Sequence, residues 1–278
     1  MNSTHACRPL GLAHFSAIQV PPQEFVALAA QAGFSAVGLR LYPAFPGAPF
    51  YEVPAGSAAS RDLQQRLNGE GMQVYDIEFV TLSADFVPDS IAPILEAANA
   101  IGAKRLSVCG DDPDRSRLVS KFAELCDLAA NFDMGVDLEN MGWRTVATFA
   151  DALAIVEKAG KPNGGALVDA LHFCRNGSEP SALGAAPGSR IRSVQLCDAG
   201  QMAPHSHEGM IAEARSGRLA PGEGVLPLTA ILRAVPEDAA VSVEVPIGPS
   251  VDPQDHIRHL FNASRHLLDL VRNVARLD

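Results

Sequence analysis

The chain has 278 residues, of which 47% are hydrophobic and 19% are charged, and a formal net charge of −10 at pH 7. This length suits one (β/α)8 barrel, which typically needs about 250 residues, and the composition is that of a globular protein with a large core. The negative charge argues against binding to nucleic acid, and no apolar stretch approaches the roughly 18 residues of a membrane-spanning helix.

Short apolar runs alternate with segments of helical spacing along the chain. The expected strands cover residues 10–13, 36–41, 73–79, 105–109, 135–139, 166–169, 193–196 and 241–245. The expected helices cover residues 23–32, 57–71, 88–101, 116–132, 148–159, 180–186, 226–234 and 254–276. Eight strand–helix units with nearly all-apolar, β-branched strands predict an α/β fold, a (β/α)8 TIM barrel forming a single domain over residues 1–278.

Glycines mark the ends of several expected helices, at Gly33, Gly71 and Gly102. Glycine tolerates the left-handed conformation that commonly ends a helix. A doubly wound open sheet is the competing fold, but it usually has a glycine-rich phosphate loop after its first strand, and residues 13–19 contain none. The barrel is therefore favoured. The least regular stretch, residues 198–225, follows the seventh expected strand, and long loops in compact domains are often functional.

Four consecutive expected strands each end in a residue that can bind a metal: Glu139, Asp169, Gln195 and Glu244. The C-terminal ends of the strands in a parallel barrel form one face, where such barrels carry out their chemistry. One strand–helix unit takes about 30 residues, so these four positions fall on successive strands. Their oxygen donors suit a hard or borderline divalent cation, and the pattern predicts one Mn²⁺, Mg²⁺ or Co²⁺ ion.

Short motifs at these positions resemble those of the xylose isomerase-like sugar isomerase/epimerase barrels. The run from Asp169 to His172 is similar to that family's Asp-x-x-His pair, and Glu139 and Glu244 match its two metal-binding glutamates. The run Arg-Leu-Ala-Pro-Gly-Glu-Gly, which begins at Arg218, resembles its Arg-x-x-Pro-Gly-x-Gly loop. The resemblance covers essentially the whole chain. It implies a divalent-metal-dependent sugar or sugar phosphate isomerase/epimerase that acts on a small polyhydroxylated carbonyl compound.

The resemblance also implies catalytic roles for three of these residues. A divalent ion bound to a carbonyl and a neighbouring hydroxyl would stabilise an enediolate as negative charge develops. Glu139 and Glu244 would face opposite sides of the substrate, one removing a proton and the other returning it. His172 is the candidate proton carrier or oxyanion partner, because its ordinary pKa is about 6.5.

Three further residues are expected to bind the substrate. Arg218 could recognise a carboxylate or phosphate group through its planar guanidinium. Glu78 ends the third expected strand and therefore lies on the same rim of the barrel. Trp143, the only tryptophan, follows the strand-five ligand and is placed to form an aromatic wall over a sugar ring.

Gln195 departs from the pattern of ketose 3-epimerases, which usually have histidine at this position. The glutamine is similar to that of bacterial 3-dehydroshikimate dehydratases, so a lyase is the first alternative, with Arg218 as the carboxylate partner. A non-catalytic sugar-binding barrel is the second, although the complete set of acids argues against it. Apurinic-site endonucleases share the fold family but need strand-end histidines and a basic face, so we expect no nucleic-acid partner. A homo-oligomer is compatible with the fold.

The five cysteines are odd in number, scattered and free of Cys-x-x-Cys spacing. We expect reduced thiols, and neither a disulfide framework nor a zinc site. The N-terminal segment lacks the basic-then-apolar layout of a signal peptide. These features predict a cytoplasmic protein with a small-molecule substrate, either sugar-like or a keto acid, and no membrane partner.

Overall fold

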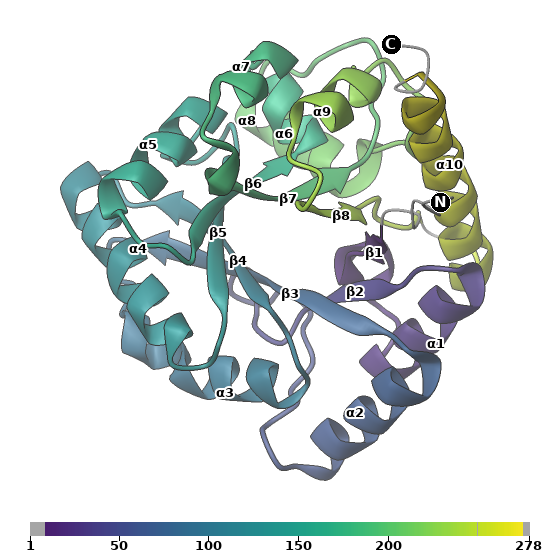
Figure 1. Ribbon diagram of the computed structural model, residues 1–278, viewed down its shortest axis with the longest axis horizontal. Coiled ribbons are helices and arrows are strands. Elements are labelled where there is room, and N and C mark those ends of the chain that lie inside the picture. The colour runs from purple at the N-terminus through teal and green to yellow at the C-terminus, as the bar shows by residue number, and fades with distance from the viewer. Residues whose placement is uncertain (1–8, 249, 275–278) are drawn as a thin grey trace, which may run out of the picture.

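The fold is a closed parallel barrel, as the sequence predicts (Figure 1). It comes from a computed structural model that describes residues 9–248 and 250–274. Each strand pairs with the next along the chain, and β8 pairs with β1 to close the ring. The strands are β1 Leu10–Leu12, β2 Ala36–Leu39, β3 Gln73–Ser83, β4 Arg105–Asp111, β5 Gly135–Glu139, β6 Gly164–Asp169, β7 Ile191–Leu196 and β8 Ala240–Val243.

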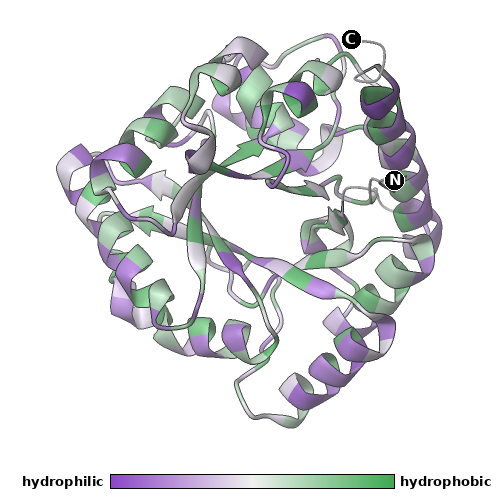
Figure 2. Ribbon diagram, in the orientation of Figure 1, coloured by the Kyte–Doolittle hydropathy of each residue, from purple (hydrophilic) through white to green (hydrophobic). Residues whose placement is uncertain are grey.

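Helices surround the barrel and turn their hydrophobic faces towards it (Figure 2). They are α1 Pro22–Ala32, α2 Ala58–Glu70, α3 Ala92–Ala100, α4 Arg115–Ala130, α5 Phe149–Ala159, α6 Ala170–Arg175, α7 Pro180–Ala185, α8 His207–Ala212, α9 Leu228–Ala234 and α10 Pro253–Val274. Shorter turns are η1 His14–Ala17, η2 Pro88–Ile91, η3 Gly188–Arg190 and the π-helical η4 Glu213–Gly217. No helix within the described residues is both long and apolar enough to cross a membrane.

Several element boundaries differ from those expected. Strand β3 continues to Ser83, with a shift in its register against β4 between Ile77 and Val80. Strand β8 ends at Val243, so Glu244 lies just beyond it, although its N–H still donates to the Leu196 carbonyl at 3.0 Å. The stretch 198–225 contains α8 and η4, and α6 follows β6 directly, neither of which was expected. Residues 275–276 of the last expected helix lie outside the described residues.

Local sequence signals begin and end the helices as expected. Gly33 and Gly71 end α1 and α2 with φ values of 109° and 66°, in the left-handed region where glycine is favoured. Thr148 begins α5 in a reciprocal capping box with Asp151. The cysteines within the described residues are free thiols, and Cys7 lies outside them.

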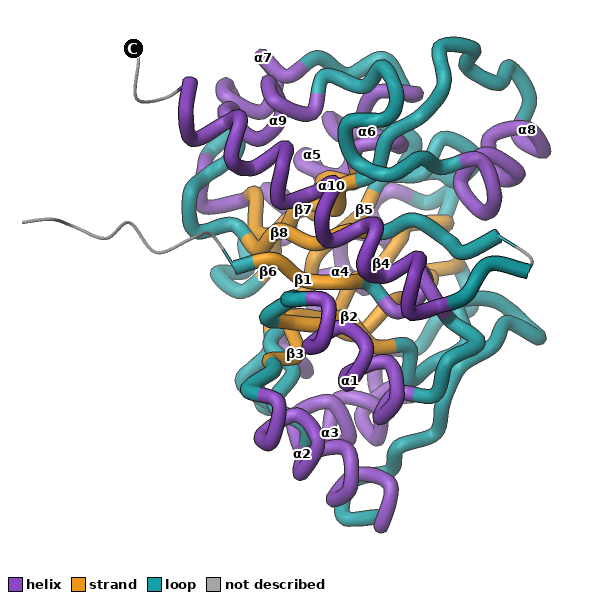
Figure 3. Tube along the Cα trace, turned by 90° about the vertical axis from the view of Figure 1, so that its right-hand side faces the viewer, coloured by secondary structure: helices purple, strands orange, loops and turns teal. Residues whose placement is uncertain are grey.

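The barrel interior below the strand ends contains polar side chains that bind one another, although Asp76 Oδ1 is buried without a hydrogen-bond partner among the described residues. Arg105 donates two hydrogen bonds to Asp137, each 2.5 Å long, and Ser193 donates a third at 2.9 Å. Ser107 donates to one oxygen of Asp76 at 2.5 Å. Arg105 is the first residue of β4, so this polar layer lies towards the end of the barrel opposite the face where the loops project, which is at the right in Figure 3 with α8.

Candidate metal and active site

The four predicted ligands lie at or just past the ends of adjacent strands and are buried. Asp169 pairs with Gln195 in the register of β6 and β7, and paired residues of neighbouring strands face the same side of a sheet. Glu139 is the last residue of β5, and Glu244 follows β8. The exposed fractions of the four residues are 5% for Glu139, 0% for Asp169, 3% for Gln195 and 8% for Glu244.

His172 joins this group because α6 begins at the end of β6. The Asp169 carboxylate caps the helix by accepting the backbone N–H of His172 at 2.9 Å. The His172 side chain is 4% exposed, and its Nε2 lies 4.0 Å from Oε1 of Glu139. Glu139, Asp169 and His172 each offer a ligand atom within 4.8 Å of the others. The structure therefore adds an imidazole to the predicted carboxylates.

Arg218 connects Glu244 to this cluster. Its buried guanidinium donates from Nη1 to Asp169 Oδ2 at 2.5 Å, and its Nη2 lies 3.1 Å from Glu244 Oε2. The same Nη2 lies 3.5 Å from Nε2 of His172. A guanidinium can only donate, so Nε2 is the acceptor in this contact and the His172 proton is assigned to Nδ1. Arg218, predicted to contact substrate, is thus engaged by two predicted metal ligands.

Burial and mutual repulsion shift the pKa values of the acids. Burial raises the pKa of Glu139 well above its ordinary range, with Asp169 and Glu244 adding to the rise. Burial also raises the pKa of Glu244 to about 7, against the opposing effect of Arg218. Burial acts the same way on Asp169, but Arg218 and His172 outweigh it and lower the pKa of that carboxyl. Burial lowers the pKa of His172 to about 4, so its imidazole is neutral at pH 7.

The charges of the cluster fit a divalent cation. When the carboxylates of Glu139, Asp169 and Glu244 are all ionised, the positive charge of Arg218 balances one of them. The two negative charges that remain would be balanced by one divalent cation. Buried charge without a partner is costly, so such a site favours a cation or retained protons. The donors are carboxylate oxygens with a neutral imidazole and an amide nearby, a set that suits a divalent cation.

Glu78 lies within β3, which continues to Ser83, and not at the strand end that the sequence predicts, and its carboxylate is satisfied by the protein. Its Oε2 accepts from Arg40 Nη2 at 3.0 Å, with both side chains at most 3% exposed. Its Oε1 accepts the backbone N–H of His14 at 2.6 Å. The Arg40 guanidinium also lies over the Phe15 ring, 4.7 Å from its centroid. The expected contact of Glu78 with substrate therefore stays a prediction.

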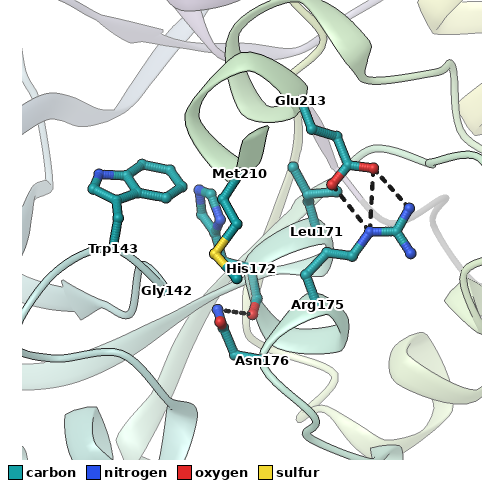
Figure 4. Close-up of a pocket in the computed structure, with 8 residues that line it drawn as sticks. All are labelled: Gly142, Trp143, Leu171, His172, Arg175, Asn176, Met210 and Glu213. Carbon is teal, nitrogen blue, oxygen red and sulfur yellow. Dashed lines mark hydrogen bonds and ion pairs between the residues drawn. The ribbon is translucent and has the colours of Figure 1, made fainter. Parts of the chain in front are cut away.

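Trp143 packs beside the cluster. Its ring is edge-on to that of His172, with the centroids 5.0 Å apart. Together with Met210 these rings line a small niche, and the three side chains point towards one another (Figure 4). The tryptophan is thus placed against a candidate site residue. Its proposed role as a wall over a sugar ring stays a prediction.

The protein is thus an α/β barrel with a candidate metal site at the carboxyl-terminal ends of its strands. The family model described as a xylose isomerase-like TIM barrel matches residues 26–267. The chain therefore belongs to the xylose isomerase-like TIM barrel family, which confirms the resemblance of its motifs.

Curated relatives match about half of the chain. An inosose isomerase of Bacillus velezensis is 32% identical over 129 residues, which cover 45% of this chain and 44% of the relative. An inosose isomerase of Halalkalibacterium halodurans is 33% identical over 132 residues, covering 46% and 45% of the two chains. The matched segment thus spans less than half the length of either relative.

Solved structures share the fold over nearly the whole chain. A xylose isomerase-like TIM barrel/4-hydroxyphenylpyruvate dioxygenase fusion protein aligns with a TM-score of 0.82 and 20% identity, covering 98% of this chain and 44% of the other. The IolI protein with a bound zinc atom aligns with a TM-score of 0.77 and 19% identity, covering 95% and 99%. The probable 3-DHS dehydratase AsbF from Bacillus anthracis aligns with a TM-score of 0.72 and 15% identity, covering 92% and 98%.

Proposed function

We propose that the protein is a divalent-metal-dependent isomerase or epimerase of a small polyhydroxylated carbonyl compound. The observation that carries the proposal is the buried group of Glu139, Asp169 and Glu244, which has Arg218 as its cationic partner and an excess of negative charge. Family membership and the inosose isomerases among the relatives support the same class of reaction.

Glu139, Asp169, Gln195 and Glu244 would hold the cation, with His172 beside them as a further donor. When bound, the ion would stabilise the negative charge that develops on the substrate's carbonyl oxygen. Asp169 is the most constrained of these residues, because it also caps α6 and accepts a hydrogen bond from Arg218. We infer that it holds the site together and takes no part in proton transfer.

The two glutamates would exchange the protons. A group with a pKa near the working pH is the most effective acid or base, and burial brings the pKa of Glu244 to about 7 in the metal-free protein. In an epimerase, one glutamate takes the proton from the carbon next to the carbonyl and the other delivers a proton to the opposite face. In an isomerase, the proton returns to the neighbouring carbon while the hydroxyl proton moves to the carbonyl oxygen.

His172 and Arg218 would orient the reacting groups. His172 is neutral at pH 7, and its Nε2, which faces Arg218 and Glu139, would serve as an acceptor or a ligand without adding charge to the site. Arg218 holds Asp169 and Glu244 in place and keeps Glu244 directed into the barrel mouth. Nε, Nη1 and Nη2 of Arg218 each already contact a protein acceptor, so its predicted contact with substrate requires one of these contacts to be released.

Solvent-deuterium exchange tests the proposal. The Mn²⁺-loaded protein is incubated in D₂O with an inosose and a panel of ketoses, and loss of the proton next to the carbonyl is followed by NMR. We expect exchange with at least one of these compounds, and we expect EDTA to abolish it. A protein that binds Mn²⁺ but exchanges no such proton in any of them contradicts the proposed reaction.

Gln195 favours a second candidate, 3-dehydroshikimate dehydratase. The residue is buried in register with Asp169, where it can offer a neutral oxygen, and the AsbF structure shares the fold. Arg218 counts against it, because the guanidinium expected to bind the substrate carboxylate is held by two protein carboxylates. Metal-dependent formation of a catechol acid from 3-dehydroshikimate, followed by absorbance, would establish the lyase. Sugar binding without exchange or absorbance change would instead indicate a non-catalytic barrel.

A further inference from the structure

Residues 207–217, which comprise α8 and the π-helical turn η4, form a segment that we call the strap. The strap belongs to the long connection after β7 and projects from the end of the barrel where the candidate site lies (Figure 3). Single turns of π-helix are rare and are frequently found at functional sites. Its three consecutive residues Glu213, Ala214 and Arg215 each contact a different part of the barrel mouth.

On the β6 side, the strap is held by a largely buried ion pair. Arg175, the last residue of α6, donates from Nε to Glu213 Oε2 at 3.0 Å and from Nη2 to Oε1 at 2.7 Å (Figure 4). The two side chains are 11% and 13% exposed. Arg175 Nη2 also donates to the Gly200 carbonyl at 2.5 Å. A two-pronged, charge-assisted contact of this kind is strong and geometrically specific.

On the β2 side, the strap is held by an exposed contact. The Arg215 guanidinium lies over the ring of Phe45, 4.5 Å from its centroid, and Phe45 is 38% exposed in the loop after β2. Strands β2 and β6 are diametrically opposite in the closed order of the barrel. The strap, which is held at α6, and the loop after β2 therefore meet over the mouth. An exposed cation–π contact is weaker than a buried, two-pronged ion pair.

At its centre, the strap makes a hydrogen bond to the candidate site. The carbonyl of Ala214 accepts a hydrogen bond from Nε of Arg218 at 3.0 Å. The other end of the same guanidinium binds Asp169 and Glu244. The position of the strap is thus linked to the position of Arg218 between two predicted ligands.

We propose that the strap is a lid over the barrel mouth, fixed at Arg175 and Glu213 and opening where Arg215 meets Phe45. In this arrangement Arg175 and Glu213 are positioning residues, which act on the site by setting where Arg218 lies. Small molecules and ions enter on the β2 side when the weaker contact is released. The existence of the lid does not depend on which reaction the protein catalyses. Its effect on the exchange of a metal ion rests on the proposed function.

Fluorescence of Trp143, the only tryptophan, tests the fixed edge in metal-free protein. Its ring shares a niche with Met210 and Glu213 of the strap. We expect Glu213→Ala to raise the acrylamide quenching constant of Trp143 at least about twofold, because local opening would uncover the ring. The charge-swapped double variant, Arg175→Glu with Glu213→Arg, should restore protection. A quenching constant in Glu213→Ala equal to that of the wild type would contradict the claim that the ion pair fixes this edge of the strap. A folded double variant in which Trp143 is still quenched faster than in the wild type would also contradict it.

Hydrogen exchange and metal release test the opening edge. We expect Phe45→Ala and Arg215→Ala to speed amide exchange across residues 207–217 and to speed Mn²⁺ release into EDTA about tenfold, with Trp143 quenching unchanged. Arg258→Ala, which removes an exposed arginine of α10 paired with Asp255, is the matched control and should change none of these. Wild-type amide exchange in both variants overturns the lid. If the wild-type protein binds no Mn²⁺, the proposed function fails, and amide exchange still decides the lid.

Discussion

The two sides of the barrel mouth use the same residue types differently. On the β3 side, the carboxylate of Glu78 is fully matched by Arg40 and the backbone N–H of His14. On the β5 side, His172 is the only basic side chain among the described residues within 4.0 Å of the Glu139 carboxylate, and it lies at that limit. A buried acid with matched partners stabilises the fold, whereas one without them is poised to bind a proton or a cation.

The strongest test of this contrast is the pair of variants Glu139→Gln and Glu78→Gln. We expect Glu139→Gln to lower turnover by about 10²–10⁴-fold, since it removes a proposed acid–base group, and to weaken Mn²⁺ binding. The free energy of unfolding should change little or rise in the metal-free protein. Exchange assays and calorimetric titration measure these effects. Normal turnover in Glu139→Gln would rule out its catalytic role.

Glu78→Gln should show the opposite profile. Removing one partner of a buried ion pair leaves Arg40 uncompensated, and we expect the free energy of unfolding to fall by about 3–5 kcal/mol. Mn²⁺ affinity should stay within a few fold of the wild type, as judged in the folded protein. Urea unfolding and metal titration check both parts. A stable variant that has lost metal or substrate binding would place Glu78 in the functional set, as the sequence predicts.

The pH dependence of stability provides a third comparison. The pKa of Glu244 is about 7 in the folded protein and 4.5 ordinarily, so the folded state holds the proton more tightly. Its stabilising effect is complete below pH 4.5 and is lost as the pH rises through 7, which amounts to about 3 kcal/mol in metal-free protein. We expect Glu244→Gln to flatten this part of the profile, measured by unfolding at a series of pH values. An unchanged slope would show that other groups are responsible.

The smallest expected effect concerns Gln195. Replacing its amide by imidazole in Gln195→His should shift metal preference towards Zn²⁺ and away from Mg²⁺ by about tenfold, because imidazole is the softer ligand. Competitive titration with the two ions measures the shift. Unchanged preference would indicate that residue 195 does not contact the ion.

The fold and the members of the site could be predicted from sequence because they depend on local patterns. Apolar runs ending in Glu139, Asp169 and Gln195 predict strand ends, and parallel strands bring those ends to one face. The helix α6 was missed because Asp169 serves both as a strand end and as the cap of the helix, which brings His172 beside the predicted ligands.

Long-range pairings could not be predicted in this way. Arg218 contacts Asp169 across 49 residues of sequence, and Glu78 takes its partner from a different strand. Neither pairing leaves a periodic signal, because each depends on how the closed barrel brings the chain together. The strap is a similar case, since Arg215 and Phe45 lie in the connections after β7 and β2 and meet only in the folded barrel.

The most direct test of the central claim is the anomalous scattering of Mn²⁺ in a crystal of the protein. We predict one strong peak between Glu139 and Asp169, within bonding distance of their carboxylates, with Arg218 displaced or reoriented to accommodate it. A peak elsewhere in the protein, or none in a crystal of protein shown to bind Mn²⁺ in solution, would contradict the assignment of these strand ends as a metal site.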